Sequence, residues 1–372
     1  MPAAVRRPPL PTAVALVGTG VAAVYLVAYG VQQATASLSN NDFRAYFAAA
    51  LVGLRQGWER IYDFPLQQAA AASIDTSWQP FANPPPLAWL VAPFTLLPFW
   101  AAYLAWEVLV VAALLLAWRL AAPGAGWTKL AHLTAALSLI AVVLALWLGQ
   151  ACVLVAAAVA VAWWLLRRGR DVEAGLVLTV ILLKPQDAFL VPIALLVAGR
   201  VRAFAGWALA AGLVAAIAAL TLGAHGLQEM LRDLAALEGV ALNHRYAVSS
   251  TLGQAPWVLG LQALLGLGAL YAAWRRRASV EMVICAGLLG SFLLTPHLSL
   301  QDFTVLIVAA WLMLRTAPPL WFRFFLLTGY ALAVFAIPIG GAPLLVVEVA
   351  WLAALAAGLQ NHQDRRPQQD DP

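Results

Sequence analysis

The segment directly after the first apolar run carries a carboxylate, a guanidinium and a phenol within five residues. Asp42 is followed by Arg44 and Tyr46. A carboxylate there can take a proton from a hydroxyl group that lies within hydrogen-bonding distance. Asp42 can equally serve as the N-cap of a helix, where aspartate is favoured. The spacing alone favours neither interpretation.

Lys184-Pro185-Gln186 lies between two short apolar runs of a chain in which 63% of the residues are hydrophobic. An ammonium group at membrane depth is costly enough to indicate a function, such as stabilising a negative charge. The alternative is a lysine whose apolar stem lies in lipid while its ammonium reaches the interface. Gln150, which opens another apolar run after Gly149, offers an amide to the same kind of site.

Two more segments carry histidine. His297 follows a proline and precedes Asp302 by five residues, and its imidazole can hydrogen-bond an anion or a hydroxyl group. Asp302 can orient that imidazole or bind a polar ligand. His244-Arg245-Tyr246 forms a basic, aromatic cluster suited to the same kinds of ligand. The structural alternatives are a histidine that only satisfies its own hydrogen bonds, an acidic residue at a helix start, and an ordinary polar loop.

The elements that position these residues must lie in a membrane. Only 10% of the 372 residues are charged, and the mean hydropathy is +0.83, whereas soluble proteins are about 25% charged. In lipid, backbone polar groups must be paired within their own segment, so apolar runs of this length form helices. The sequence shows no strand-like alternation of the kind that β-barrels have. We expect an all-α, polytopic integral membrane protein.

The apolar runs predict about twelve membrane-spanning helices. They lie at roughly 11–33, 99–120, 130–148, 151–166, 172–184, 187–199, 203–223, 251–274, 279–295, 301–315, 323–339 and 343–360. If the N-terminus is cytoplasmic, the cytoplasmic connections and termini hold 16 of the 22 Lys and Arg residues, as the positive-inside rule expects. Both termini are therefore predicted to be cytoplasmic. The Arg6-Arg7 pair also fits a signal peptide, but the first apolar run is longer than a signal core, which favours an uncleaved span.

Some segments are too short for ordinary spans. Pro86–Pro98 is read as an interfacial or re-entrant segment. The runs at 172–184 and 187–199 are read as two half-depth helices or one broken pair. We expect a single transmembrane unit over 1–360 and a disordered cytoplasmic tail over 361–372.

This topology leaves two long loops, 34–85 and 224–250, on the extracytoplasmic face. The spacing from Asp42 to Arg55 predicts an amphipathic helix that lies on the membrane surface. Most of the polar residues named above fall on the same face. We therefore expect the chemistry to take place there.

The remaining sequence features exclude several partners. The net charge of +5 is spread over single residues and short clusters between apolar runs, so nucleic acid is not expected. Cys152 and Cys285 lie inside apolar runs and are read as small core residues. Histidine and acidic residues show no metal-ligand spacing. We expect neither a metal nor a cofactor.

Four of these segments, in order, resemble glycosyltransferase family 87, a group with the GT-C fold. The likeness rests on Asp42-Phe43 with Tyr46, Ala49, Ala50, Gly57 and Tyr62-Asp63, on Phe81-Ala82-Asn83-Pro84-Pro85-Pro86, on Gly149-Gln150 with Lys184-Pro185-Gln186, and on Thr295-Pro296-His297 with Asp302. It covers about residues 12–320. Phe47 departs from the pattern, because the family often has tryptophan at that position.

The resemblance implies inverting transfer of a hexose, mannose in the family, from a polyprenyl monophosphate to a hydroxyl of a cell-envelope glycolipid or glycan. It implies Asp42 as the catalytic base, on the extracytoplasmic side of the cell membrane. The phosphate-binding candidates are Lys184, His297, Arg245 and His244. The substrate-binding candidates are Arg44, Tyr46, Asn83, Gln150, Gln186 and Asp302.

A secondary transporter or a flippase of a polar or lipid-linked solute is the main alternative. Transporters tend to show internal repeats and ionisable residues at the bilayer midplane. This sequence has no evident repeat, and its ionisable residues fall mostly at the expected interfaces. A non-catalytic scaffold would leave Asp42, Lys184 and His297 without a joint purpose. The predicted partners are therefore a lipid-linked sugar donor, a glycan or glycolipid acceptor, and membrane lipid.

Overall fold

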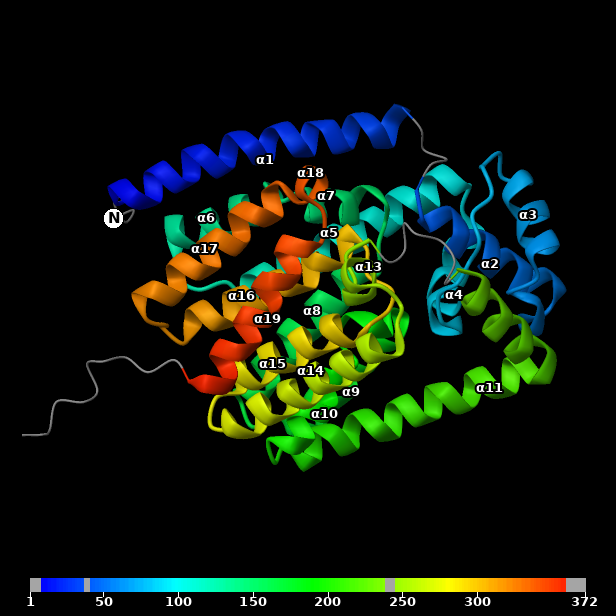
Figure 1. The fold of residues 1–372 in the computed structure, drawn as a ribbon. Coiled ribbons are helices and arrows are strands. Elements are labelled where there is room, and N and C mark those ends of the chain that lie inside the picture. The colour runs from blue at the N-terminus through cyan, green and yellow to red at the C-terminus, as the bar shows by residue number, and fades with distance from the viewer. Residues whose placement is uncertain (1–7, 37–40, 238–244, 359–372) are drawn as a thin grey trace, which may run out of the picture.

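The computed structural model describes residues 8–36, 41–237 and 245–358, and every regular element in these ranges is a helix (Figure 1). The helices pack around one continuous apolar core. Two helices lie at its centre, α8 (Cys152–Leu166) and α15 (Val280–Leu294), and both are buried along most of their length. The predicted all-α class is confirmed.

Four helices in the described part of the chain are long and apolar enough to cross a membrane. They are α1 (Leu10–Ala36), α5 (Phe99–Ala121), α11 (Val201–Leu237) and α14 (Pro256–Arg275). In Figure 1, α1 runs along one side of the bundle and α11 along the opposite side. Both expose long apolar faces, as lipid-facing helices do.

The predicted span at 130–148 is not one straight helix. It consists of α6 (Gly126–Leu137) and α7 (Ile140–Trp147), which meet at an angle of 72°. If this bent pair is one span, five spans pass the length test. The Ser138 hydroxyl at the break donates to the Ala135 carbonyl (2.8 Å). This bond satisfies a backbone acceptor where the helix is interrupted.

The other predicted spans form shorter helices. They include α8, α15, α16 (Thr304–Arg315), α17 (Leu320–Val334), α18 (Ala336–Ile339) and α19 (Ala342–Ala357). A helix of 15 residues is about 22 Å long, less than the ~30 Å of the hydrocarbon core. The structure fits a polytopic membrane protein, and the count of twelve spans stays a prediction.

The chain around Lys184 forms two short helices. They are α9 (Asp171–Leu178) and α10 (Leu190–Val197), joined by the 3₁₀ turns η3 (Thr179–Leu183) and η4 (Pro185–Asp187). Lys184, between the turns, has φ −153° and ψ 77°. A residue before proline avoids the helical region, so Pro185 explains the interruption. The structure shows the short-helix arrangement that the sequence predicted.

The first predicted outer loop is largely helical. It contains α2 (Phe43–Gln56), η1 (Trp58–Arg60) and α3 (Phe64–Ala72). The α2 helix was predicted. Ten of its 14 residues are buried, so its apolar face packs against protein, and its position at the membrane surface stays a prediction. It packs against α3, η1 and the pair α4 (Pro85–Val91) and η2 (Ala92–Leu96). Its run of small alanines lets these neighbours approach from several sides.

The α4–η2 stretch spans only 12 residues, from Pro85 to Leu96, and is too short to cross a bilayer as a straight helix. This agrees with the interfacial or re-entrant reading of 86–98. The segment lies with α2 and α3 at one end of the molecule (Figure 1).

The second predicted outer loop, 224–250, begins as a helix. α11 bends at Gly223, which has φ 59° and ψ −172°, a conformation open to glycine. Beyond the bend, α11 packs against η1 of the first loop, and the two loops therefore meet at one end of the bundle (Figure 1). The short helix α13 (Val248–Leu252) follows. His244 lies outside the described residues.

Candidate functional site

Asp42 stands at the start of α2, against the turn between α7 and α8. Its backbone amide donates to the Leu148 carbonyl (3.0 Å). Its side chain makes no capping bond. Asn41 takes that role, because its Oδ1 accepts from the Arg44 amide (3.1 Å). Asp42 thus occupies the N-cap position, as predicted, but its side chain does not cap the helix, and its carboxylate is directed elsewhere.

Two glutamine amides hold the Asp42 carboxylate. Gln79 Nε2 donates to Oδ1 (2.9 Å), and Gln150 Nε2 donates to Oδ2. Gln79 in turn accepts from Arg44 Nη2 (2.9 Å), and Arg44 Nη1 donates to the Ser77 hydroxyl. A carboxylate has about four acceptor positions. Asp42 is thus fixed in orientation and keeps capacity for a further proton donor.

Burial raises the pKa of Asp42 above its ordinary value of 3.8. The hydrogen bond from Gln79 and the positive charges of Lys184 and Arg44 act in the opposite direction. Asp42 is still partly exposed, so a ligand can reach it. A carboxylate with a raised pKa is a stronger base, and hydrogen-bond donors on both oxygens keep it in the ionised form.

Gln150 connects Asp42 to a buried ion pair. Its Oε1 accepts from Lys184 Nζ (2.8 Å), and the same ammonium pairs with the Asp302 carboxylate. Lys184 is 6% exposed and Asp302 2% exposed. Lys184 therefore does not reach the interface in the way the structural alternative supposed. A continuous polar chain joins Asp42, Gln150, Lys184 and Asp302.

Asp302 is held from the other side by the helix that carries it. It lies in the 3₁₀ turn η5 (Leu300–Phe303), which leads into α16. Its Oδ2 accepts from the Ser299 amide (2.9 Å), as part of a capping box. The helix-start role and the ion pair with Lys184 therefore coexist, one on each carboxylate oxygen.

Asp187 lies beside this ion pair and is completely buried. Among the described residues, neither of its carboxylate oxygens has a hydrogen-bond partner. Single ligand atoms of Asp187, Asp302 and Cys152 lie within 4.8 Å of one another, the spacing of a potential metal site. Lys184 already provides Asp302 with a cation, however. The expectation of no metal stays a prediction.

Aromatic residues of α5 hold the turn that carries Gln150. Gly149 has φ 68°, and its carbonyl accepts from Trp106 Nε1 (2.8 Å). The Tyr103 hydroxyl donates to the Trp147 carbonyl (2.6 Å). Tyr46 of α2 is buried, and its hydroxyl lies 3.5 Å from Gln150 Oε1. Tyr46 thus contacts the cluster as a wall residue.

Two other predicted substrate-binding residues, Asn83 and Gln186, lie beside the cluster and not within it. The Asn83 carbonyl accepts from the Tyr62 hydroxyl (2.8 Å). Gln186 is half-buried in η4, next to Asp187. Within the described residues neither side chain hydrogen-bonds Asp42, so the structure does not join them directly to the cluster.

His297 and Arg245 come from segments that touch each other. The Tyr246 amide donates to the Leu298 carbonyl (3.3 Å), and the Tyr246 ring packs edge-on against Phe303 (5.7 Å between centroids). Arg245 is exposed and donates to the Ile337 carbonyl (3.2 Å). His297 is half-buried. Both side chains therefore belong to the surface beside η5, which carries Asp302.

Sequence reasoning missed two side chains of the cluster. Gln79 lies in a polar stretch with no motif, and nothing in the sequence places it against Asp42. Asp187 had a signal, because it directly follows Lys184-Pro185-Gln186 and no lysine stands nearby except Lys184. An acidic residue in an apolar chain, three positions from a lysine, is a candidate for the same site.

An apolar helical fold with a polar cluster at one end of its core helices is typical of a membrane protein that acts on a polar or lipid-linked ligand. The family model for glycosyltransferase family 87 matches residues 81–296, more than half of the 372 residues. The chain therefore belongs to glycosyltransferase family 87.

The predicted family is confirmed, and a glycosyltransferase is favoured over the transporter, the flippase and the scaffold. The matched residues include Gln150 and Lys184, whereas Asp42 precedes the matched range and Asp302 follows it. No curated protein matches the chain. No solved structure matches it either.

Proposed function

We propose that this glycosyltransferase moves a hexose, mannose by family likeness, from a polyprenyl monophosphate to a hydroxyl of a cell-envelope glycolipid or glycan. The observation that carries the proposal is the Asp42 carboxylate, held by Gln79 and Gln150 at a partly exposed position. Transfer to a hydroxyl needs one fixed base, and Asp42 has the placement and the pKa direction for it.

The chemistry is a single displacement with inversion. The acceptor oxygen attacks the anomeric carbon on the face opposite to the phosphate. The bond between that carbon and the phosphate oxygen breaks, and its electron pair leaves with the polyprenyl phosphate. The hydroxyl proton passes to the Asp42 carboxylate. Gln79 and Gln150 position this carboxylate, which saves the entropy of orienting it in each turnover.

The leaving phosphate needs positive charge or hydrogen-bond donors. Lys184 contributes its charge from a buried position, while its ammonium stays bonded to Gln150 and Asp302. Direct contacts to the phosphate are assigned to Arg245 and His297, on the accessible surface beside η5. His244, their neighbour in the sequence, remains a candidate on the same segment.

We assign the protein to the cell membrane, with the Asp42 end on the extracytoplasmic side and both termini in the cytoplasm. The support is the placement of arginines at the opposite ends of the core helices, as in Arg167 after α8 and Arg315 at the end of α16. The polyprenyl chain would then stay in lipid while its phosphate reaches the site from the side.

The test is sugar transfer in proteoliposomes from polyprenyl-phosphate-mannose to a panel of mannosides and glycolipids. Asp42→Asn is expected to lower the rate by roughly 10²–10⁴-fold, the usual contribution of a general base. Asp63→Asn is the matched control, because Asp63 only caps α3 (Oδ1 to the Leu66 amide, 3.1 Å), and asparagine caps equally well.

Three results would contradict the proposal. Full activity of Asp42→Asn would move the base elsewhere. Loss of activity in Asp63→Asn alone would assign the base to Asp63. No transfer by the unmodified protein from this donor to any acceptor would exclude the donor class.

A further inference from the structure

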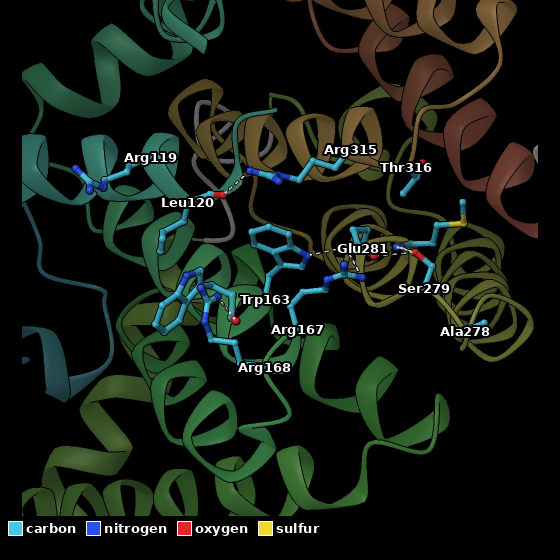
Figure 2. A pocket seen from close by; sticks show the side chains of 12 residues that line it. Arg119, Leu120, Trp163, Arg167, Arg168, Ala278, Ser279, Glu281, Arg315 and Thr316 are labelled. Atoms are coloured by element: carbon cyan, nitrogen blue, oxygen red, sulfur yellow. Dashed lines mark hydrogen bonds and ion pairs between the residues drawn. The ribbon is translucent and has the colours of Figure 1, made fainter. Parts of the chain in front are cut away.

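A second polar feature lies at the other end of the core helices. It is a hollow of about 660 Å³ (Figure 2). Gln150 precedes α8 and Arg167 follows it, while Asp302 precedes α16 and Arg315 ends it. The hollow is therefore separated from the Asp42 cluster by the length of α8, about 22 Å for its 15 residues. It is a separate site.

The lining of the hollow is strongly basic. It contains four arginines and one carboxylate: Arg119, Arg167, Arg168, Arg315 and Glu281. The net formal charge of this lining is therefore +3. Arg119, Arg167 and Arg168 are exposed, so their guanidinium groups are accessible to a ligand.

The single carboxylate is already compensated on its own wall. Glu281 Oε1 accepts from Trp163 Nε1 (3.0 Å), and Oε2 accepts from the Ser279 hydroxyl (3.0 Å). Arg167 Nη1 lies 3.6 Å from the same carboxylate. Figure 2 shows Glu281 between these partners. Its single negative charge offsets one of the four arginine charges that line the hollow.

Two of the arginines are held in fixed positions. The Arg315 guanidinium lies 4.7 Å from the Trp163 ring centroid, and its Nε donates to the Ala121 carbonyl at the end of α5 (2.7 Å). The Arg168 guanidinium lies 3.7 Å from the Trp164 ring centroid. Stacked, planar guanidinium groups lose little freedom when they bind a phosphate. The hollow is prepared for an anion.

We propose that this hollow binds the phosphate of an anionic phospholipid headgroup. Its volume lies in the range of ordinary ligand sites. Leu115, one turn before Arg119 on the same face of α5, is exposed, and so is Leu116. An acyl chain can lie along these leucines while the headgroup phosphate reaches the arginines. Trp164 at the rim is the residue type that favours the bilayer interface.

The test compares lipid retention by native mass spectrometry after extraction from nanodiscs of phosphatidylcholine and phosphatidylglycerol. A hydrogen bond from a guanidinium group to a phosphate strengthens binding by roughly tenfold. The double variant Arg119→Gln/Arg168→Gln should therefore lower retention of phosphatidylglycerol by roughly 100-fold. The control Arg275→Gln/Arg323→Gln removes the same charge from arginines that do not line the hollow, and should retain the lipid.

Equal retention of phosphatidylglycerol by both double variants and the unmodified protein would overturn the proposal. The arginines would then only set the orientation of the protein in the membrane. Equal loss in both variants would overturn it too, since net charge rather than the hollow would bind the lipid. A third arm adds inorganic phosphate to protein in pure phosphatidylcholine nanodiscs. Retention of phosphate as strong as that of phosphatidylglycerol would assign the hollow to a soluble anion and overturn the lipid source. The readout needs no sugar transfer.

Discussion

Replacing Lys184 by methionine is expected to destabilise the protein more than removing either carboxylate beside it. Lys184 pairs with Asp302, and Asp187 lies next to both, buried and without a hydrogen-bond partner in the described part of the chain. The ammonium is therefore the one positive charge within this buried group. Without it, two carboxylates face each other in a place that water does not reach.

The size of the effect follows from the burial of the pair. Lys184 and Asp302 are both buried, and oxygen atoms of Asp187 and Asp302 lie within 4.8 Å of each other, so without the ammonium Asp302 can ionise only at a large desolvation cost. Breaking a buried ion pair costs about 3–5 kcal/mol in general. We expect a loss in the free energy of unfolding of this size for Lys184→Met.

The carboxylate variants should cost less. In Asp302→Asn, the Lys184 ammonium still has the Asp187 carboxyl group beside it. The expected loss in the free energy of unfolding is therefore about 1.5–3 kcal/mol, the value of a hydrogen bond to a charged group. Asp187→Asn replaces a buried carboxyl group that, within the described residues, has no hydrogen-bond partner. It should change the free energy of unfolding by less than about 1 kcal/mol, or raise it.

The assay is unfolding by sodium dodecyl sulfate in mixed micelles, followed by helical circular dichroism. Lys129→Met is the matched control, because Lys129 is only half-buried and forms no ion pair in the described part of the chain; losing its hydrogen bond to the Arg119 carbonyl should cost about 0.5–1.5 kcal/mol. A loss below 1 kcal/mol for Lys184→Met would refute the reasoning. So would a loss in Asp187→Asn as large as that in Lys184→Met.

Transfer should fall as the pH drops through the pKa of Asp42, which burial raises, since only the ionised base accepts a proton. Gln79→Leu removes a bond that favours the ionised form, so the acid limb of the pH–rate profile should move to higher pH, and an unmoved limb would contradict the role of Gln79. Gln150→Leu should lower kcat by roughly a hundredfold through misplacement of Asp42, with little change in KM; a change in KM alone would make Gln150 a binding residue. Gly149→Ala should cost about 1–2 kcal/mol in unfolding experiments, because Gly149 has φ 68°. Gly212→Ala, where the added methyl meets open space, should cost nothing.

The polar cluster was largely predictable because membrane topology limits where polar residues can lie. Four of its residues each stand at the end of an apolar run: Asp42, Gln150, Lys184 and Asp302. The positive-inside rule assigns all four ends to the extracytoplasmic face of the membrane. The structure brings these four together through hydrogen bonds and an ion pair. Their roles in transfer remain predictions.

The surroundings of each helix were harder to predict. Apolar periodicity shows which face of a helix avoids water. It does not show whether that face contacts lipid or other parts of the protein. α2 therefore looked like a surface helix, although its alanine-rich turns are packed inside the protein. The break between α6 and α7 has no proline, and hydropathy alone reads 130–148 as one run. Gln79 was missed because its contact with Asp42 depends on how a polar stretch folds back.

The proposed inversion would place a geometric demand on the site, and this demand separates the candidate phosphate ligands. The attacking and leaving oxygens lie on opposite faces of the anomeric carbon, so the phosphate must lie across the sugar from Asp42. Gln79, Gln150 and Arg44 are bonded directly to the carboxylate or to its partner. Groups bound that close to the base cannot also hold the leaving phosphate. The surface beside η5, with His297 and Arg245, is separate from these contacts. A phosphate bound there can therefore lie across the sugar from Asp42 more readily than a phosphate bound at Lys184.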